Sequence, residues 1–465
     1  MFLNIDKVLP DKIAMIDDEG SSTYGELVSF CREYMNYIPE RCLIFILCEH
    51  AAAAVETIAA SVENHIVPLL LGHDTDHELV MNFIELYKPA YLWVPERLAG
   101  KFDYEAAARR RTYTLLKTGF PPYELYEDLS LLLATSGSTG SPKLVRHSYG
   151  NLDATAVNVA ESFGLSDDER AMISLPINFT QGLSTVTSNL LCGGTLLLTK
   201  ASLVQKPFWN MMKEQKATSF TGVPYSFEIL NKLRFFKMDL PDLKLVNQGG
   251  GRLTDDMFKA LASYAEENNK RFIASYGSTE TTSRMACLPP SLAMSKTGSI
   301  GRAIANGNII IADDNGCEVT EPNALGEIIY SGKNVTLGYG ESPADLLKGD
   351  ERGGVYHTGD LAYKDEDGCI FIVGRKTRFL KLFGYRIGLD ETERLLRSSF
   401  DAEFACVGTD KKMIVYTTKS LPEKEVINFL QSKTGINGQA FAVRIIDALP
   451  KNPTGKTLYS KLENT

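Results

Sequence analysis

The chain has 465 residues, of which 44% are hydrophobic and 23% charged, and its formal net charge is −9. This is the balance of a globular protein with a sizeable core, and the negative charge disfavours a nucleic-acid partner. No two of the eight cysteines have C-x-x-C spacing, so we expect buried thiols in a reducing, cytoplasmic compartment rather than a zinc cluster. The N-terminus lacks a signal-peptide pattern. The most apolar early stretch, residues 50–71, carries charged residues and lacks the ~20 continuous apolar residues of a membrane span.

The first hundred residues alternate between two patterns. Short apolar runs rich in β-branched and aromatic residues predict strands, and longer runs with helical periodicity predict helices. The expected strands are 42–48, 65–71 and 90–95, and the expected helices are 51–64 and 76–89. Such alternation is typical of β-α-β units around a parallel sheet.

The pattern continues with expected strands at 193–200, 218–224, 243–251 and 271–280. From about residue 308, short apolar runs separated by Asp-Gly and Asn-Gly turns predict a small β-rich subdomain. After Gly374, the sequence predicts helices at 389–400 and 421–435 and strands at 402–408, 412–418 and 441–447. We therefore expect an α/β protein with a large domain, 1–375, and a small α+β domain, 376–465.

A loop of small hydroxylated residues follows the apolar run at 131–134. Gly137 and Gly140 allow the backbone N–H groups to turn toward an anion, and Lys143 adds a positive charge. The hydroxyl donors are Thr135, Ser136, Ser138 and Thr139. The spacing differs from that of the common phosphate loop. Taken alone, the stretch is compatible with either a phosphate site or a flexible linker.

Three further stretches carry chemistry. Residues 275–280, SYGSTE, combine an aromatic ring, a glycine, hydroxyls and a carboxylate. Residues 356–361, YHTGDL, place Asp360 in an expected turn, where it can accept hydrogen bonds from a ribose diol. Residues 450–456, PKNPTGK, place Lys456 near the end of the chain. Each stretch alone reads equally well as an ordinary turn or a solvated tail.

Together and in this order, the four stretches resemble the adenylate-forming superfamily of acyl-CoA synthetases, aryl-CoA ligases, firefly luciferase and peptide-synthetase adenylation domains. Shorter stretches at 175–183, 249–253, 298–304, 326–339 and 374–387 fit the same family. The resemblance runs from about residue 131 to the end. Within the superfamily, YGSTETTSRM and SIGRAI resemble stand-alone acyl-acid ligases. The implied fold is a large domain of layered α/β subdomains with a small β-barrel-like subdomain, followed by a small mobile α+β domain.

The resemblance implies a reaction in which a carboxylic acid and ATP give an acyl-adenylate and pyrophosphate. Because a carboxylic acid with a pKa near ~4 is already ionised, the attack needs no general base. The site must instead bring two anions together and neutralise their charge. This fits a site rich in lysine, hydroxyl groups and backbone N–H groups.

The resemblance also assigns roles to individual residues. The catalytic residues are Lys456, which bridges the substrate carboxylate and the α-phosphate, Thr279 at the α-phosphate, and Glu280, which holds Mg²⁺. Tyr276 stacks on adenine against Gly251, and Asp360 and Arg375 bind the ribose. The nucleotide-binding set is Thr135, Ser136, Ser138, Thr139, Lys143, Gly250, Gly251, Ser275, Tyr276, Gly277, Ser278, Asp360, Ile372 and Arg375.

In the superfamily, the small domain rotates before a thiol attacks the adenylate. Lys456 then leaves the site and the segment around Lys381 and Gly384 enters it. The usual Asp or Lys of the hinge is replaced here by Thr377, which puts the usual hinge contacts in doubt. Residues 374–388 contain five basic residues and no acidic one. We expect a local positive face that receives coenzyme A, or the phosphopantetheine arm of an acidic acyl carrier protein.

The acid pocket is predicted around Phe179, Thr180, Val223 and Gln248. Amino-acid-activating relatives usually hold the substrate ammonium with an aspartate, and here Thr180 occupies that position. A small apolar, hydroxylated or fatty acid therefore fits at least as well as an amino acid. Other functions remain open: a ligase that passes the acyl group to an amine or hydroxyl, a non-catalytic nucleotide- or carrier-binding module, and a luciferase-type oxygenase.

Overall fold

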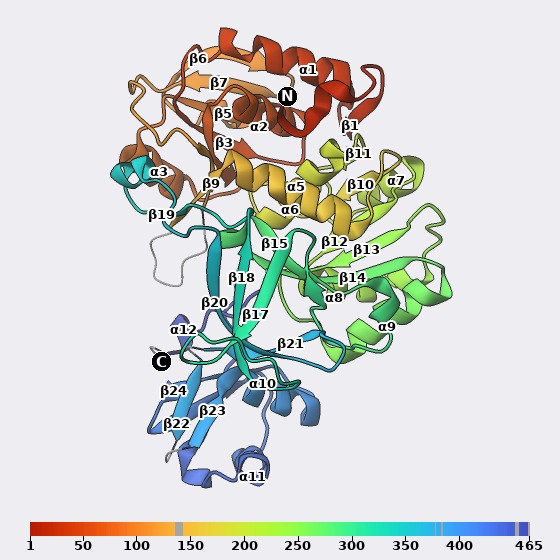
Figure 1. The fold of residues 1–465 in the computed structure, drawn as a ribbon, viewed down its shortest axis with the longest axis vertical. Coiled ribbons are helices and arrows are strands. Elements are labelled where there is room, and N and C mark those ends of the chain that lie inside the picture. The colour runs from red at the N-terminus through yellow and green to blue at the C-terminus, as the bar shows by residue number, and fades with distance from the viewer. Residues whose placement is uncertain (135–142, 377, 383–384, 452–454, 464–465) are drawn as a thin grey trace. The chain divides into compact units, whose positions relative to one another are not determined.

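The fold was obtained as a computed structural model, which describes residues 1–134, 143–376, 378–382, 385–451 and 455–463 (Figure 1). Contacts within the chain divide it into two compact units. Unit 1 comprises Met1–Asn308 and Tyr330–Tyr356, and unit 2 comprises Ile309–Ile329 and His357–Thr465. The division groups the segments around residues 309–329 and 357–375 with the C-terminal part. The boundary expected at residue 375 stays a prediction.

Unit 1 contains an eight-stranded sheet in the order β19-β9-β8-β4-β3-β5-β7-β6. Its strands are β3 (Leu43–Cys48), β4 (Val67–Gly72), β5 (Tyr91–Pro95), β6 (Glu105–Arg110), β7 (Tyr113–Lys117), β8 (Leu129–Ala134), β9 (Leu144–Ser148) and β19 (Gly338–Gly340). The central pairs β3–β4, β3–β5 and β4–β8 are parallel, and the outer pairs are antiparallel. The early β-α-β prediction is confirmed for the centre of this sheet.

The second sheet of unit 1 has nine strands in the order β16-β15-β14-β13-β12-β10-β11-β1-β2. They are β1 (Ile13–Asp17), β2 (Gly20–Thr23), β10 (Arg170–Ile173), β11 (Thr195–Leu198), β12 (Ser219–Gly222), β13 (Leu245–Gln248), β14 (Arg271–Ser278), β15 (Ser283–Cys287) and β16 (Arg302–Ala303). The run from β1 through β11, β10, β12 and β13 to β14 is parallel. β14 and β15 then form a hairpin.

Nine helices are described in unit 1: α1 (Tyr24–Glu33), α2 (Ala52–Glu63), α3 (His77–Tyr87), α4 (Glu96–Ala99), α5 (Tyr149–Phe163), α6 (Thr180–Leu191), α7 (Lys206–Glu214), α8 (Pro224–Lys232) and α9 (Asp255–Glu267). α2 is buried on all sides, as its apolar, alanine-rich sequence predicts. α5 begins with a capping box between Ser148 and Asn151 and ends at Gly164, whose φ of 57° favours glycine. α5 and α6 pack against each other and against β15.

Unit 2 holds most of a four-stranded sheet, β17-β18-β20-β21, and a C-terminal α+β part. Its elements are β17 (Gly307–Ala312), β18 (Gly326–Gly332), β20 (Val355–Lys364), β21 (Ile370–Arg375), β22 (Phe379–Leu382), β23 (Tyr385–Gly388), α10 (Leu389–Ser399), β24 (Phe404–Thr409), β25 (Lys412–Thr417), α11 (Glu423–Thr434), β26 (Phe441–Ile445) and α12 (Ser460–Glu463). The predicted β-rich subdomain and α+β domain are therefore present.

Two further expectations bear on composition. Five cysteines are buried, Cys192 and Cys287 are partly exposed, and Cys317 is exposed, so the buried-thiol expectation holds for most of them. No helix among the described residues is long and apolar enough to cross a bilayer.

Candidate active site

The predicted phosphate loop joins two paired strands. β8 ends at Ala134 and β9 begins at Leu144, and these two residues are opposite each other in the antiparallel ladder. Thr135, Ser136, Ser138 and Thr139 lie outside the described residues. Lys143 is described: its Nζ lies 2.7 Å from Glu341 Oε1 and 5.6 Å from the centre of the Tyr339 ring. The lysine thus belongs to a cluster formed with the segment after β18.

Glu280 lies two residues after the end of β14, in the short 3₁₀ turn Thr279–Thr281, whereas the sequence predicted that the strand runs to residue 280. The Tyr339 hydroxyl donates to Glu280 Oε1 over 2.8 Å. The Glu280 carbonyl accepts from the Thr336 N–H and hydroxyl, each at 3.0 Å, and from Arg352 Nη1 at 3.2 Å. The turn that carries Thr279 and Glu280 is therefore held by residues 56 to 72 positions later in the chain.

Tyr339 and Arg352 are functional candidates that the sequence analysis did not identify. The Arg352 guanidinium lies 4.7 Å from the centre of the Tyr339 ring and donates to Thr336 Oγ1 at 2.6 Å. Burial and the neighbouring Glu280 carboxylate raise the pKa of Tyr339 to about 12, so its hydroxyl keeps its proton at neutral pH. The only sequence signal was Tyr339 within the family-like stretch 326–339.

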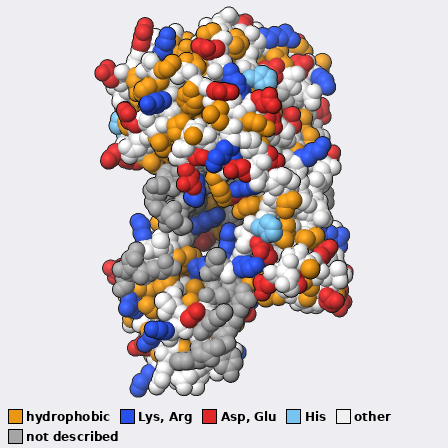
Figure 2. All heavy atoms as spheres, turned by 60° about the vertical axis from the view of Figure 1, so that its left-hand side comes forward, with side chains coloured by type: hydrophobic (Ala, Val, Ile, Leu, Met, Phe, Trp, Pro, Cys, Tyr) orange, Lys and Arg blue, Asp and Glu red, His pale blue; other side chains and the backbone are white. Residues whose placement is uncertain are grey.

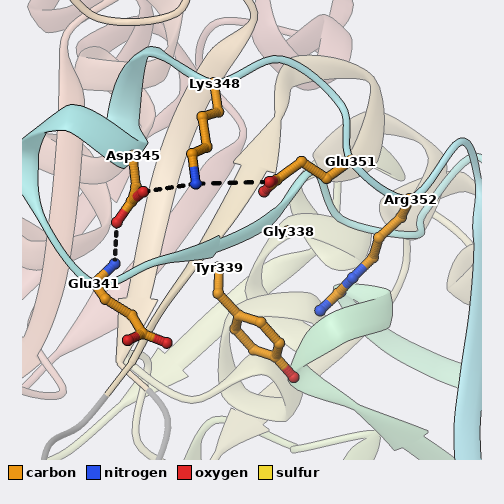
Figure 3. Close-up of a pocket in the computed structure, with 7 residues that line it drawn as sticks. All are labelled: Gly338, Tyr339, Glu341, Asp345, Lys348, Glu351 and Arg352. Carbon is orange, nitrogen blue, oxygen red and sulfur yellow. Dashed lines mark hydrogen bonds and ion pairs between the residues drawn. The ribbon is translucent and has the colours of Figure 1, made fainter.

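Tyr339 and Arg352 also line an open pocket of about 460 Å³ (Figure 3). Their side chains point to the same side of the pocket, away from the ion-pair chain above them. In that chain Lys348 Nζ lies 2.8 Å from Asp345 Oδ1 and 3.8 Å from Glu351 Oε1. These bonds fix the 341–351 loop beside Tyr339.

Gly277 in β14 permits a close approach between strands. A Cβ atom at this position would lie 1.6 Å from the Ser283 carbonyl oxygen, so only glycine fits. On the same strand, the Ser275 hydroxyl donates to the Gln248 carbonyl at 3.0 Å. Tyr276 and Ser278 are partly exposed in β14. The motif 275–280 is thus held against β13 and β15.

The predicted acid-pocket residues come from three elements that meet in unit 1. Phe179 and Thr180 form the start of α6, Val223 precedes α8, and Gln248 ends β13. The Val223 side chain lies at the position where a Cβ on Gly250 would contact it at 3.0 Å. Gln248 Nε2 donates to the Gly251 carbonyl over 2.6 Å. The structure therefore brings the start of α6, the start of α8 and the glycine loop together.

Gln181 is a further residue that the sequence analysis named only as part of a range. A Cβ on Gly249 would lie 2.0 Å from Gln181 Nε2, so this amide packs directly on the glycine loop. His147 in β9 is fully buried, and burial lowers its pKa to about 3. Its Nδ1 lies 3.2 Å from Thr282 Oγ1. The imidazole next to the 279–282 turn is therefore neutral.

Asp360 and Arg375 belong to unit 2, where they form an ion pair of 2.6 Å between Arg375 Nε and Asp360 Oδ1. The expectation that Asp360 lies in a turn was wrong: it lies inside β20, opposite Arg375 of β21. The local sequence Thr-Gly-Asp resembles a turn, but pairing with β21 extends the strand through it. Ile372 pairs with Ala362 in the same ladder.

Lys456 lies between the paired residues Lys451 and Thr457 near the C-terminal end of unit 2. Three residues later, the Tyr459 hydroxyl donates to Glu393 Oε2 at 3.0 Å. The Arg378 guanidinium stacks on the Tyr459 ring at 3.4 Å and donates to Glu393 Oε1 at 2.7 Å. Thr377 and Gly384 lie outside the described residues, and Lys381 is placed only as a member of β22.

The positive face expected for residues 374–388 is not supported for the three basic residues whose side chains are described. Arg375 pairs with Asp360, Lys376 with Glu327 at 3.1 Å, and Arg378 with Asp390 at 2.8 Å. The sequence placed no acid within the segment, but the fold brings acids to it from elsewhere. In the upper part of the view in Figure 2, acidic and basic side chains of the described residues are interspersed.

Comparison with known proteins identifies the family. The family described as AMP-binding enzyme matches residues 5–340. This chain belongs to that family. It is 27% identical to a 2-succinylbenzoate–CoA ligase of Oceanobacillus iheyensis, over 97% of this chain and 96% of the relative. It is 28% identical to an indoleacetate–CoA ligase of Aromatoleum aromaticum, over 70% of this chain and 65% of that relative.

Among solved structures, the chain resembles O-succinylbenzoate coenzyme A synthetase from Bacillus subtilis in complex with AMP. The TM-score is 0.79 at 24% identity, and the match covers 100% of this chain and 98% of the other. The predicted superfamily and fold class are thereby confirmed. The chain is therefore an adenylate-forming enzyme, and the relatives in Oceanobacillus and Aromatoleum are named as CoA ligases.

Proposed function

We propose that this ligase activates a small carboxylic acid with ATP and Mg²⁺ and passes the acyl group to coenzyme A. The observation that carries the proposal is the Glu280 turn, which Tyr339, Thr336 and Arg352 hold in place beside Lys143. This cluster combines two carboxylates, Glu280 and Glu341, with two cations, Lys143 and Arg352, and that combination suits a metal-bound triphosphate.

The residues fit a magnesium ion. Glu280 Oε1 accepts the Tyr339 hydroxyl, and Oε2 has no hydrogen-bond partner among the described residues. Mg²⁺ prefers one or two carboxylates together with phosphate oxygens. Glu280 would hold the ion, which when bound would supply charge neutralisation at the phosphates.

The remaining roles are those that the family resemblance implies. Lys143 and the loop hydroxyls would bind the departing pyrophosphate, and Tyr276 would stack on adenine. Asp360, with Arg375, would bind the ribose, and Lys456 would stabilise the charge that develops between the carboxylate and the α-phosphate. His147 is neutral and buried, so it does not serve as a general base. That agrees with a substrate acid that is already ionised.

The choice between acceptors favours coenzyme A. The pairing of Arg375, Lys376 and Arg378 with acids weakens the positive face expected for either acceptor, so it does not separate the two. The relatives of Oceanobacillus and Aromatoleum are named as CoA ligases. A carrier protein, an amine or a hydroxyl acceptor, the domain boundary at residue 375, the hinge at Thr377 and a cytoplasmic location stay predictions.

Acid-dependent exchange of pyrophosphate into ATP tests the first half-reaction. The panel contains aliphatic, aryl, hydroxy and amino acids, together with 2-succinylbenzoate and indoleacetate. We expect exchange with at least one acid, dependent on Mg²⁺ and lost in Glu280→Gln. Addition of coenzyme A should then give a thioester. Exchange without thioester formation would indicate an amine or hydroxyl acceptor, and ATP binding without exchange would favour a binding module.

A further inference from the structure

Arg284 of β15 is one of the largest fully buried side chains of the protein, with 2% of its surface exposed. It has no acidic partner among the described residues. Nη1 donates to the hydroxyls of Ser184 and Ser283, the latter at 2.8 Å, and Nη2 donates to Asn247 Oδ1 at 3.1 Å. Within the part of the chain that the structure describes, its Nε has no hydrogen-bond partner. The guanidinium is therefore surrounded by neutral groups only.

The other large buried arginine, Arg146, has an acidic partner. Arg146 of β9 is equally buried, but Glu351 lies 2.5 Å from its Nη2 and compensates its charge. At Arg284, the nearby Cys287 thiol offers no such charge, because burial raises its pKa to about 11 and keeps it protonated. Burial lowers the pKa of Arg284 only to about 10, so the guanidinium is charged at neutral pH. A buried charge without a counter-ion is costly, which calls for an anion from outside the chain.

The neighbours of Arg284 place it beside the predicted acid pocket. Ser184 lies four residues after Thr180 on α6, so the two side chains share one face of the helix. The Ser184 hydroxyl donates to the carbonyl of Gln181, which packs on the glycine loop, and Asn247 Nδ2 donates to Ser275 Oγ, each at 3.1 Å. The Arg284 side chain thus contacts α6 and β13, one helical turn further along α6 than Thr180.

Arg284 is also separate from the groups proposed to act on the reacting carboxylate. Its side-chain contacts come from α5, through Phe163 at 5.3 Å, and from α6, β13 and Ser283 of its own strand. None comes from the turn that carries Thr279 and Glu280. An anion bound here would therefore be a second group of the substrate, not the carboxylate that is activated.

Resting on the proposed function, we propose that Arg284 binds a second carboxylate on the acid, so that the substrate class is dicarboxylic. The planar guanidinium matches a carboxylate, and Nε is the donor left for it. Ser184, Ser283 and Asn247 hold the guanidinium in place. A hydroxyl or amide on the substrate could accept a hydrogen bond, but it would leave the buried charge uncompensated.

The test compares diacids, by pyrophosphate exchange, with analogues that keep one carboxylate and have the other replaced by a neutral amide or removed. Each aliphatic diacid from three to eight carbons is paired with its monoamide, and 2-succinylbenzoate is paired with 4-oxo-4-phenylbutanoate. We expect the wild type to favour the diacid about 10- to 100-fold in kcat/KM for the best pair. A preference for the neutral analogue in every pair would overturn the proposal.

Variants assign the preference to Arg284. Arg284→Met should lower kcat/KM for the diacid about 10- to 100-fold and change the monoamide less than ~3-fold, while Arg284→Lys keeps part of the preference. Arg109→Met, which removes an exposed arginine from β6, should leave the selectivity unchanged. Equal losses for both members of a pair in Arg284→Met would contradict the assignment. If Arg284→Met does not fold, the wild-type ratio of kcat/KM for the two members of a pair, and the same ratio in Arg284→Lys, test the assignment.

Thermal unfolding separates this proposal from the proposed function. A diacid that binds Arg284 raises the unfolding temperature of the wild type more than its monoamide does, whether or not exchange occurs. A larger rise in unfolding temperature with the diacid, without any pyrophosphate exchange, would contradict the proposed activity and support the diacid site. A larger shift with the monoamide would overturn the diacid site.

Discussion

The phenolic hydroxyl of Tyr339 donates a 2.8 Å hydrogen bond to Oε1 of Glu280, a residue 59 positions earlier in the chain. One oxygen of the carboxylate proposed to hold Mg²⁺ is thus oriented by a neutral donor. The raised pKa of Tyr339, about 12, keeps this donor protonated across the physiological range. A protonated phenol is uncharged, so it orients the carboxylate and leaves its negative charge for Mg²⁺.

Tyr339→Phe should raise the Mg²⁺ concentration needed for half-maximal adenylation about 3- to 10-fold, the effect of one lost hydrogen bond. The ring and its stacking with Arg352 remain in this variant. Magnesium titrations of pyrophosphate exchange measure the change. Tyr123→Phe is the control, since its hydroxyl binds the Tyr87 carbonyl instead. An unchanged magnesium dependence would remove Tyr339 from the site.

Lys456→Ala should lower adenylation by about 10²- to 10³-fold, because the role proposed for Lys456 is to stabilise the charge that develops in the reaction. ATP binding should survive, since the other nucleotide contacts remain. Pyrophosphate exchange and equilibrium binding of ATP measure the two effects. Lys461→Ala changes another exposed lysine of the same tail and should stay within about 2-fold of wild type. Full exchange activity in Lys456→Ala would refute its role.

Lys381→Glu and Gly384→Trp should impair thioester formation at least ~10-fold more than adenylation, if the segment around them serves the second half-reaction. Single-turnover formation of adenylate and of thioester separates the two steps. Lys411→Glu reverses a charge in the turn between β24 and β25 and should affect neither step. Equal losses in both steps would argue against a separate thiol-binding state.

His147 should make the protein sensitive to mild acid. Its folded pKa is lowered to about 3, against about 6.5 when unfolded, so its contribution to stability is complete above pH 6.5. The contribution is lost as the pH falls from 6.5 toward 3, amounting to about 2 kcal/mol between pH 7.5 and pH 5. Urea unfolding at these two pH values measures it. In His147→Gln the loss should shrink by that amount, and an identical loss would contradict the lowered pKa.

Tyr459→Phe should destabilise unit 2 by about 1 kcal/mol through the lost hydrogen bond to Glu393. Tyr459→Leu should cost about 1 kcal/mol more, because the stacking with Arg378 is also lost. Protease sensitivity of the C-terminal tail and the rate of adenylation report the effect. Tyr363→Phe, in a ring stacked on Phe371, is the control. Unchanged protease sensitivity and adenylation rate in Tyr459→Leu would show that the contacts of Tyr459 with Glu393 and Arg378 do not stabilise unit 2.

Local sequence patterns predicted the helices and strands whose buried residues follow a clear periodicity in the sequence. The apolar run of β3, the alanine-rich α2 and the amphipathic α10 lie where periodicity placed them. The order of motifs identified Glu280 and Lys456 as site candidates, and their roles stay predictions. Features set by distant pairing were missed. Asp360 lies in a strand because β21 pairs with it, and Tyr339 meets Glu280 only through the fold.

The same limit applies to charge. The basic run 374–388 looked unpaired because its acids, Asp360, Glu327 and Asp390, lie before or after it in the chain. Nothing in the sequence marked Arg284, because only the fold shows that no described acid pairs with it. Pairing over long distances decides both cases, and local composition carries no information about it.

Glu393 joins three stretches of unit 2: its own helix α10, Arg378 just after the position of Thr377, and Tyr459 just after Lys456. The side chains of Arg378, Glu393 and Tyr459 contact one another, so a substitution in one of them affects the other two. A chimera that takes its C-terminal segment from a relative should therefore be joined before residue 378 and carry its own versions of all three. A junction between residues 378 and 459 would pair an arginine from one parent with a carboxylate or ring from the other, and would leave the segment that bears Lys456 poorly anchored.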